Sequence, residues 1–133
     1  MATILLVEDE AGVRSAMRRG LQRLGHTVVE ACDGGEALRS LEGQPVALVI
    51  TDINMPGMDG IELILALTER CPGMPVIAIS GGGLVPKESL LADARTLGVV
   101  TTLEKPVELA TLQAAVARAL ATAPGTETDT GGP

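Results

Sequence analysis

The sequence predicts one α/β domain in which two layers of helices cover a parallel β-sheet. Short β-branched runs alternate with longer stretches of helical spacing, so strands and helices are expected to follow one another along the chain. Some of the short runs are apolar at every position, which is typical of strands buried on both faces. The chain has 133 residues, of which 46% are hydrophobic, and this suits a single domain with its own core.

Five short runs are expected to form the strands of this sheet. They cover residues 3–7, 27–30, 47–51, 75–79 and 99–103. The first run contains Ile-Leu-Leu-Val and the third contains Ala-Leu-Val-Ile, and neither stretch has a polar position that could face solvent. We therefore expect parallel pairing under two helix layers rather than an antiparallel sheet with one wet face.

Five helices are expected between and after these strands. The clearest pattern places an apolar residue every three or four positions from Val13 to Leu24, and Gly25 is expected to end this helix. The five expected helices cover residues 13–24, 35–41, 60–69, 87–97 and 109–120. This alternating order predicts a flavodoxin-like doubly wound fold of five strands in the order 2-1-3-4-5, with five helices. The domain is expected to span residues 1–121, and residues 122–133, which carry no large apolar side chain, are expected to form a disordered tail.

The composition excludes several classes of function. The chain contains no Phe, Tyr or Trp, so it offers no aromatic platform on which bases could stack. Its formal net charge is −7, and an acidic chain repels nucleic-acid phosphates. We therefore expect no direct contact with nucleic acid.

The sequence is expected to belong to a soluble, cytoplasmic protein without membrane insertion. No run approaches the roughly 18 apolar residues of a membrane helix, and the acidic start is unlike a signal peptide. Cys32 and Cys71 are expected to be reduced and partly buried thiols. His26, the single histidine, cannot complete a zinc site with them and is expected to lie in a surface loop.

Polar side chains follow four of the predicted strands at one edge of the sheet. They are Glu8, Asp9, Asp52, Ser80 and Lys105. In an open parallel sheet the carboxyl ends of the strands form the ligand site, so we expect these side chains to converge. Two carboxylates at roughly 4 Å repel by about 4 kcal/mol at an effective dielectric near 20. A hard divalent cation such as Mg²⁺ relieves this repulsion and is selected by oxygen ligands.

Such a site is suited to phosphoryl transfer. A carboxylate can act as the nucleophile and form an acyl phosphate. A magnesium ion and a lysine neutralise the oxygens of the transferring group, and a serine hydroxyl supplies a further donor. Each element alone is weak, since acidic pairs and Lys-Pro pairs are common in ordinary loops.

The residues at these strand ends resemble the receiver domain of bacterial response regulators. The resemblance spans residues 4 to about 120 and rests on four stretches, 4–10, 49–60, 75–81 and 103–106. The stretch from Asp52 to Gly60, Asp-Ile-Asn-Met-Pro-Gly-Met-Asp-Gly, is the most specific.

This resemblance implies a role for each site residue. Asp52 is the phosphoacceptor, and Ser80 and Lys105 bind the phosphoryl oxygens. The Lys105–Pro106 peptide bond is expected to be cis. The resemblance also implies a metal site, whose Mg²⁺ ligands are Glu8, Asp9, Asp52 and the backbone carbonyl of Asn54.

The resemblance further implies a signalling phosphoacceptor that is not an enzyme, since it catalyses only its own phosphorylation and slow autodephosphorylation. Its phosphodonor is a histidine kinase or a histidine phosphotransfer protein, and its downstream target is an unknown protein. In the family, phosphorylation draws the hydroxyl at the position of Ser80 toward the phosphoryl group, and an aromatic switch residue turns inward behind it. This chain has Thr102 at the aromatic position, and it also departs from the family at Val107 and in the glycine-rich stretch 81–83. We therefore expect residues 81–91, rather than Thr102, to report phosphorylation.

Three alternative functions and one open surface accompany this interpretation. An Asp-nucleophile phosphatase would need a second aspartate where Asn54 stands. A flavin or nucleotide binder would need a bare helix N-terminus after the first strand to receive phosphate, but residues 8–10 lie there and repel it. A purely structural module is the third alternative. The first helix carries four arginines, at positions 14, 18, 19 and 23, which form either a solvated face or a docking surface for an acidic or kinase helix. The protein is either stand-alone, which the short tail favours, or excised from a longer chain.

Overall fold

The strands of the sheet lie where the sequence predicts them, to within one or two residues. The computed structural model describes residues 2–53, 60–80 and 99–121. Within those ranges the strands are β1 (Thr3–Val7), β2 (Thr27–Ala31), β3 (Leu48–Asp52), β4 (Val76–Ser80) and β5 (Thr101–Glu104). The helices in the same ranges are α1 (Ala11–Arg23), α2 (Gly34–Gly43), α3 (Gly60–Arg70) and α5 (Leu109–Ala121). The helix expected over residues 87–97 and the tail expected over 122–133 lie outside the described residues.

All five strands pair in parallel, in the order β2-β1-β3-β4-β5, as predicted. The three inner strands are buried along almost their whole length, which is why their sequences do not alternate. The edge strands β2 and β5 contain exposed and half-buried positions instead. The polarity pattern of each strand therefore follows its place in the sheet.

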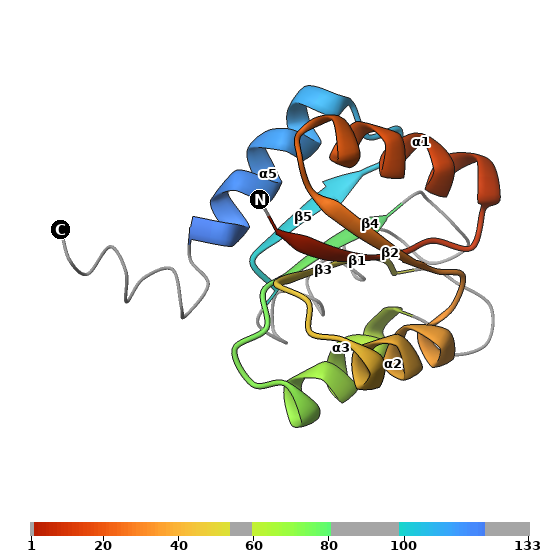
Figure 1. Ribbon diagram of the computed structural model, residues 1–133, viewed down its shortest axis with the longest axis vertical. Coiled ribbons are helices and arrows are strands. Elements are labelled where there is room, and N and C mark those ends of the chain that lie inside the picture. Colours follow the sequence, from red (N-terminus) through yellow and green to blue (C-terminus); the bar gives the residue numbers. More distant parts are fainter. Residues whose placement is uncertain (1, 54–59, 81–98, 122–133) are drawn as a thin grey trace, which may run out of the picture.

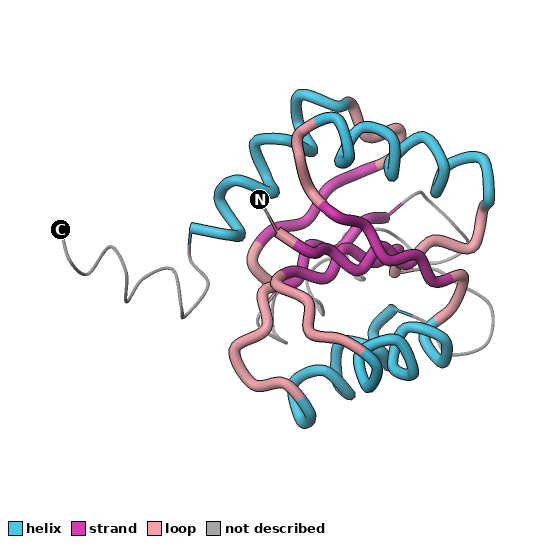
Figure 2. Tube along the Cα trace, viewed as in Figure 1, coloured by secondary structure: helices cyan, strands magenta, loops and turns pink. Residues whose placement is uncertain are grey.

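Helices cover both faces of the sheet, with α1 and α5 on one face and α2 and α3 on the other (Figure 1). Coloured by secondary structure, the strands form the middle layer between two helical layers (Figure 2). Neighbouring residues of one strand serve opposite layers: Leu5 belongs to the core under α2 and α3, whereas Leu6 belongs to the core under α1 and α5. Both cores are aliphatic, as the absence of aromatic residues requires.

Local signals explain where α1 ends and where α2 begins. Gly25 follows α1 with a φ of 94°, a left-handed conformation that glycine adopts without a steric penalty. The carboxylate of Asp33 accepts a hydrogen bond from the Glu36 backbone N–H at 2.8 Å and caps the start of α2. The Glu36 side chain in turn accepts from the Cys32 N–H at 2.7 Å. With this cap α2 begins at Gly34, one residue before the predicted start, and it ends at Gly43, two residues after the predicted end.

Two predictions about single residues need correction. Cys32 is exposed, not partly buried, because the chain leaves the edge strand β2 at Ala31. Cys71 is partly buried, as predicted, and both thiols are free. His26 precedes β2 as expected, but its ring is half-buried and its Nδ1 accepts a hydrogen bond from the Ala2 N–H at 3.1 Å. Burial lowers the pKa of His26 below its ordinary value.

Candidate functional site

The predicted site residues meet at the carboxyl edge of the sheet. Asp52 is the last residue of β3 and Ser80 the last residue of β4, while Glu8 directly follows β1. The backbone N–H of Lys105 donates to the Ser80 carbonyl at 2.9 Å, so the β4–β5 pairing carries on to Lys105. The parallel register thus brings together side chains from four separate stretches of sequence.

The ammonium group of Lys105 is the centre of the site. Its Nζ lies 2.8 Å from Asp52 Oδ2 and 2.9 Å from Glu8 Oε1. A third carboxylate oxygen, Glu10 Oε1, lies 3.8 Å from the same nitrogen. Burial acts to lower the pKa of Lys105, but the contacts with Asp52 and Glu8 outweigh it and raise that pKa above its ordinary value. Lys105 is therefore a firmly charged cation that partly neutralises the acidic cluster.

Glu8 is a buried carboxylate held by backbone and side-chain contacts. Its side chain is 1% exposed, and its Oε2 accepts a hydrogen bond from the Glu10 N–H at 3.0 Å. Its backbone N–H donates to the Ala31 carbonyl at 3.0 Å, which extends the β1–β2 pairing by one residue. Burial raises the pKa of Glu8, and the charge of Asp52 raises it further, against the contacts with Glu10 and Lys105. A second positive charge beside Glu8 would relieve this cost of burial.

Glu8, Asp9 and Asp52 fit a divalent cation. Each offers one carboxylate oxygen, and the three oxygens lie within 4.8 Å of one another. Glu8 Oε1 is buried without a well-directed hydrogen bond, although it is paired with Lys105. Asp9 is exposed, so the cluster is open to solvent on one side. An all-oxygen set of this charge is the kind that holds Mg²⁺.

Ser80 supplies an unused donor at the same edge. Its side chain is buried, and its Oγ has no hydrogen-bond partner among the residues that the structure describes. A buried hydroxyl without a partner is costly, so a ligand oxygen at this position would be stabilised by it.

Gly60 is a site-supporting residue to which the sequence alone assigned no role. A Cβ added at Gly60 would collide with the backbone carbonyl of Asp52 and the Cα of Ile53. The Gly60 N–H donates to the Ile53 carbonyl at 2.8 Å. The start of α3 is therefore packed directly against the backbone that carries Asp52, which only glycine permits.

The expectations for the Lys105–Pro106 bond, for Thr102 and for Asn54 have different outcomes. The Lys105–Pro106 bond is cis, as the resemblance implies. Thr102 is half-buried in β5 and lies opposite Ala78 in the register. Asn54 and the glycine-rich stretch 81–83 lie outside the described residues, so their expected roles remain predictions.

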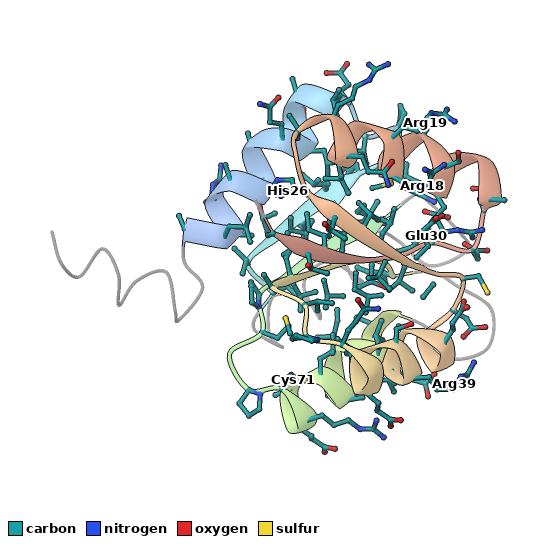
Figure 3. The ribbon with its side chains drawn as sticks, viewed as in Figure 1. Arg18, Arg19, His26, Glu30, Arg39 and Cys71 are labelled. Carbon is teal, nitrogen blue, oxygen red and sulfur yellow. The ribbon has the colours of Figure 1, made fainter. Side chains whose placement is uncertain are left out.

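The arginines of α1 are only partly a solvated face. Arg14 and Arg18 are half-buried, and both pair with the carboxylate of Glu30 in β2, at 3.1 and 3.2 Å. Figure 3 shows Arg18 and Glu30 close together, with His26 at the other end of the same strand. Arg19 is exposed and donates to Ser15 Oγ at 3.0 Å. Arg14 also contacts the site, which the sequence pattern did not predict.

Comparison with known proteins gives one consistent result. Residues 4–117 match the family described as response regulator receiver domain. The chain is 38% identical over 127 residues to the transcriptional regulatory protein GlrR of Escherichia coli, an alignment that covers 95% of this chain but 28% of that protein. The chain thus spans less than a third of the length of that relative.

Solved structures agree with this match. A response regulator receiver domain protein from Clostridium thermocellum superposes with a TM-score of 0.84 at 28% identity, over 90% of this chain and 94% of that one. The chemotaxis protein CheY4 of Vibrio cholerae superposes with a TM-score of 0.80 at 29% identity, over 90% and 99% of the two chains.

Proposed function

Because the chain belongs to the response regulator receiver domain family, we propose that it is the phosphoacceptor of a two-component phosphorelay, with Asp52 as the acceptor. The observation that carries this proposal is the contact of the Lys105 ammonium with Asp52 at 2.8 Å, beside Glu8. The lysine holds one oxygen of Asp52, and it is placed to pair with a phosphoryl oxygen that arrives at the same carboxylate.

The transfer step follows from the chemistry of a carboxylate nucleophile. A carboxylate oxygen of Asp52 forms a bond to phosphorus while the bond between phosphorus and the donor nitrogen breaks, which leaves an acyl phosphate on Asp52. Lys105 offsets the charge on the phosphoryl oxygens, and the Ser80 hydroxyl donates to one of them. In this account the protein is a signalling component that promotes its own phosphorylation and slow dephosphorylation, not an enzyme acting on other substrates.

The metal that the proposal requires is Mg²⁺. Glu8, Asp9 and Asp52 would hold it with carboxylate oxygens, and the backbone carbonyl of Asn54 is a further proposed ligand. When bound, the ion supplies positive charge that stabilises the oxygens of the transferring group. The chain's own contribution is to fix these carboxylates on the ends of β1 and β3.

A histidine that donates the phosphoryl group must come from another protein. His26 precedes β2, at the end of the strand opposite to the site, so this histidine cannot deliver a phosphoryl group to Asp52. We propose a histidine kinase or a histidine phosphotransfer protein as the donor. Next to Lys105, α1 and the segment after β5 border a groove of about 560 Å³, whose lining includes Val13, Met17 and Val107. A helix of the donor seated in this groove would bring its histidine to the mouth of the site.

The output is proposed to be a change of protein partner. Thr102 is small and β-branched, so its rotation would bury far less area than an aromatic switch residue. We therefore assign the response to residues 81–91, which lie outside the described ranges.

In the described part of the chain, none of the helices has the length and apolar character needed to cross a membrane. Cytoplasmic location and the absence of nucleic-acid contact belong to the same proposal.

The function is tested with a small-molecule phosphodonor. The wild-type chain, incubated with acetyl phosphate and Mg²⁺, is expected to gain one phosphoryl group by intact-mass measurement, and Asp52→Asn is expected to gain none. An adduct of equal yield on Asp52→Asn would overturn the assignment of the acceptor.

A further inference from the structure

Arg14 connects the acidic turn after β1 to the rest of the fold. Its Nη1 donates a hydrogen bond to the backbone carbonyl of Glu8 at 2.8 Å, and its Nε donates to Glu30 Oε1 at 3.1 Å. The first contact reaches the backbone that carries Glu8 and Asp9, and the second anchors the guanidinium on β2. We propose that Arg14 is a positioning residue for the divalent cation, and this inference rests on the function proposed above.

Within the described part of the chain, Arg14 donates the hydrogen bond that reaches the Glu8–Asp9 peptide unit directly. The backbone N–H of Glu8 is tied to Ala31, and its carboxylate is tied to the Glu10 N–H. The first contact holds the amide before Glu8 and the second holds the Asp9–Glu10 amide, so neither reaches the Glu8–Asp9 peptide unit that lies between them. The orientation of the unit itself is set at the Glu8 carbonyl, where Arg14 donates. That orientation decides the direction in which Asp9, an exposed residue, presents its carboxylate.

The helix start gives the turn no comparable support. Glu10 occupies the N-cap position of α1, and its side chain makes no capping hydrogen bond. The first helical hydrogen bond runs from the Arg14 N–H to the Glu10 carbonyl at 2.9 Å. Arg14 therefore meets the turn twice, through its backbone at Glu10 and through its side chain at Glu8.

Arg14 is itself held in place before any cation binds. The carboxylate of Glu30 accepts from Arg14 through Oε1 and lies 3.2 Å from the Nε of Arg18 through Oε2. The Arg14 side chain is 21% exposed, so the contact is partly shielded from solvent. A planar guanidinium can span two acceptors in fixed directions, which a lysine at this position could not do.

Arg18 provides a matched control for the charge. It pairs with the same Glu30, but its other hydrogen bonds go to Gln22 and Ser15 on its own helix. Replacing either arginine by methionine removes one positive charge from the same face. Loss of positive charge by itself tightens the binding of a cation. Loss of a positioning contact weakens it, so the two effects have opposite signs.

The test is a calorimetric titration of the full chain with Mg²⁺, in the absence of any phosphodonor. Arg14→Met is expected to bind Mg²⁺ about tenfold more weakly than wild type, the low end of the range for partners that orient a metal ligand. Arg18→Met is expected to bind as wild type or more tightly. A thermal melt of each metal-free variant identifies the temperatures at which it is folded, and the titration is run at such a temperature. A loss of stability alone then leaves the measured affinity for Mg²⁺ unchanged. If Arg14→Met does not fold, Arg14→Lys takes its place, because it keeps the charge but cannot span both acceptors.

The outcomes separate the two proposals. Affinity in Arg14→Met equal to or above that of wild type would overturn the positioning role and leave the metal site intact. Equal weakening in Arg14→Met and Arg18→Met would also overturn it, since the effect would then come from Glu30. If wild type itself binds no Mg²⁺, both the positioning role and the metal site proposed above are wrong.

Discussion

Lys105 Nζ and Asp52 Oδ2 lie 2.8 Å apart, although 53 positions separate the two residues in the sequence. The contact is possible because β3 and β5 flank β4 in a parallel sheet and end at the same edge. Glu8, directly after β1, lies 2.9 Å from the same nitrogen. One cation is thus shared by two buried carboxylates, and this sharing has direct consequences for stability.

Lys105→Met should destabilise the metal-free fold. Glu8 and Asp52 would then face each other without the cation, and breaking a buried pair costs about 3–5 kcal/mol, less here because Lys105 is 19% exposed. Saturating Mg²⁺ should restore more stability to this variant than to wild type, since it replaces the missing charge. Urea unfolding with and without Mg²⁺ measures both effects. An equal gain from Mg²⁺ in the two proteins would contradict this prediction.

Asp9→Asn should weaken Mg²⁺ binding and slow phosphorylation by acetyl phosphate, because it removes an anionic oxygen from the cluster. The control is Glu10→Gln, which removes the same charge from the next residue. Glu10 approaches Lys105 only at 3.8 Å and its side chain is 67% exposed, so this variant should lose much less affinity for Mg²⁺.

Chelation of Mg²⁺ should stop phosphorylation of the wild type. Phosphorylation that continues in excess EDTA would show that the acidic cluster is not a metal site.

Gly60→Ala should destabilise the protein by about 1–3 kcal/mol, since the added methyl group would overlap backbone atoms of Asp52 and Ile53. Gly12→Ala is the matched control in α1, where a Cβ meets nothing within 4 Å. It should be neutral or stabilising by up to about 1 kcal/mol, because alanine has the higher helix propensity. Chemical unfolding of both variants makes the comparison. A Gly60→Ala variant as stable as Gly12→Ala would refute the packing argument.

The contribution of His26 to the stability of the protein should fall as the pH drops below the ordinary His26 pKa of 6.5. Burial lowers the pKa of His26 in the folded chain, so the unfolded chain binds a proton more readily. The stabilising contribution is therefore complete above the ordinary value and is lost as the pH falls toward the lowered one. His26→Asn, which keeps an acceptor for the Ala2 N–H, should flatten the change between pH 7.5 and pH 5.5. A variant with the same pH dependence as wild type would remove His26 as the cause.

The fold was predictable because its signals are local. Unbroken apolar runs indicated the buried strands, and β1, β3 and β4 are indeed buried along almost their whole length. The polar residues at the strand ends then indicated the site, because a parallel sheet brings those ends together.

Other features depend on tertiary distances that no local pattern encodes. The contact of Arg14 with the Glu8 carbonyl requires the direction of one side chain on α1. The exposure of Cys32 depends on where β2 leaves the sheet edge, and the hydrogen bond of His26 depends on the path of the N-terminal residues. Such contacts follow from the folded arrangement and could not be inferred from periodicity.

The central claim is that Asp52, paired with Lys105, is the single residue that accepts the phosphoryl group. The most direct test is to phosphorylate the full chain with acetyl phosphate and Mg²⁺, reduce the acyl phosphate with borohydride, and map the modified residue by peptide mass spectrometry. Reduction converts a phosphorylated aspartate to homoserine, and the account predicts this conversion at position 52 alone. Homoserine at Asp9, or the corresponding alcohol at a glutamate of the cluster, would contradict it.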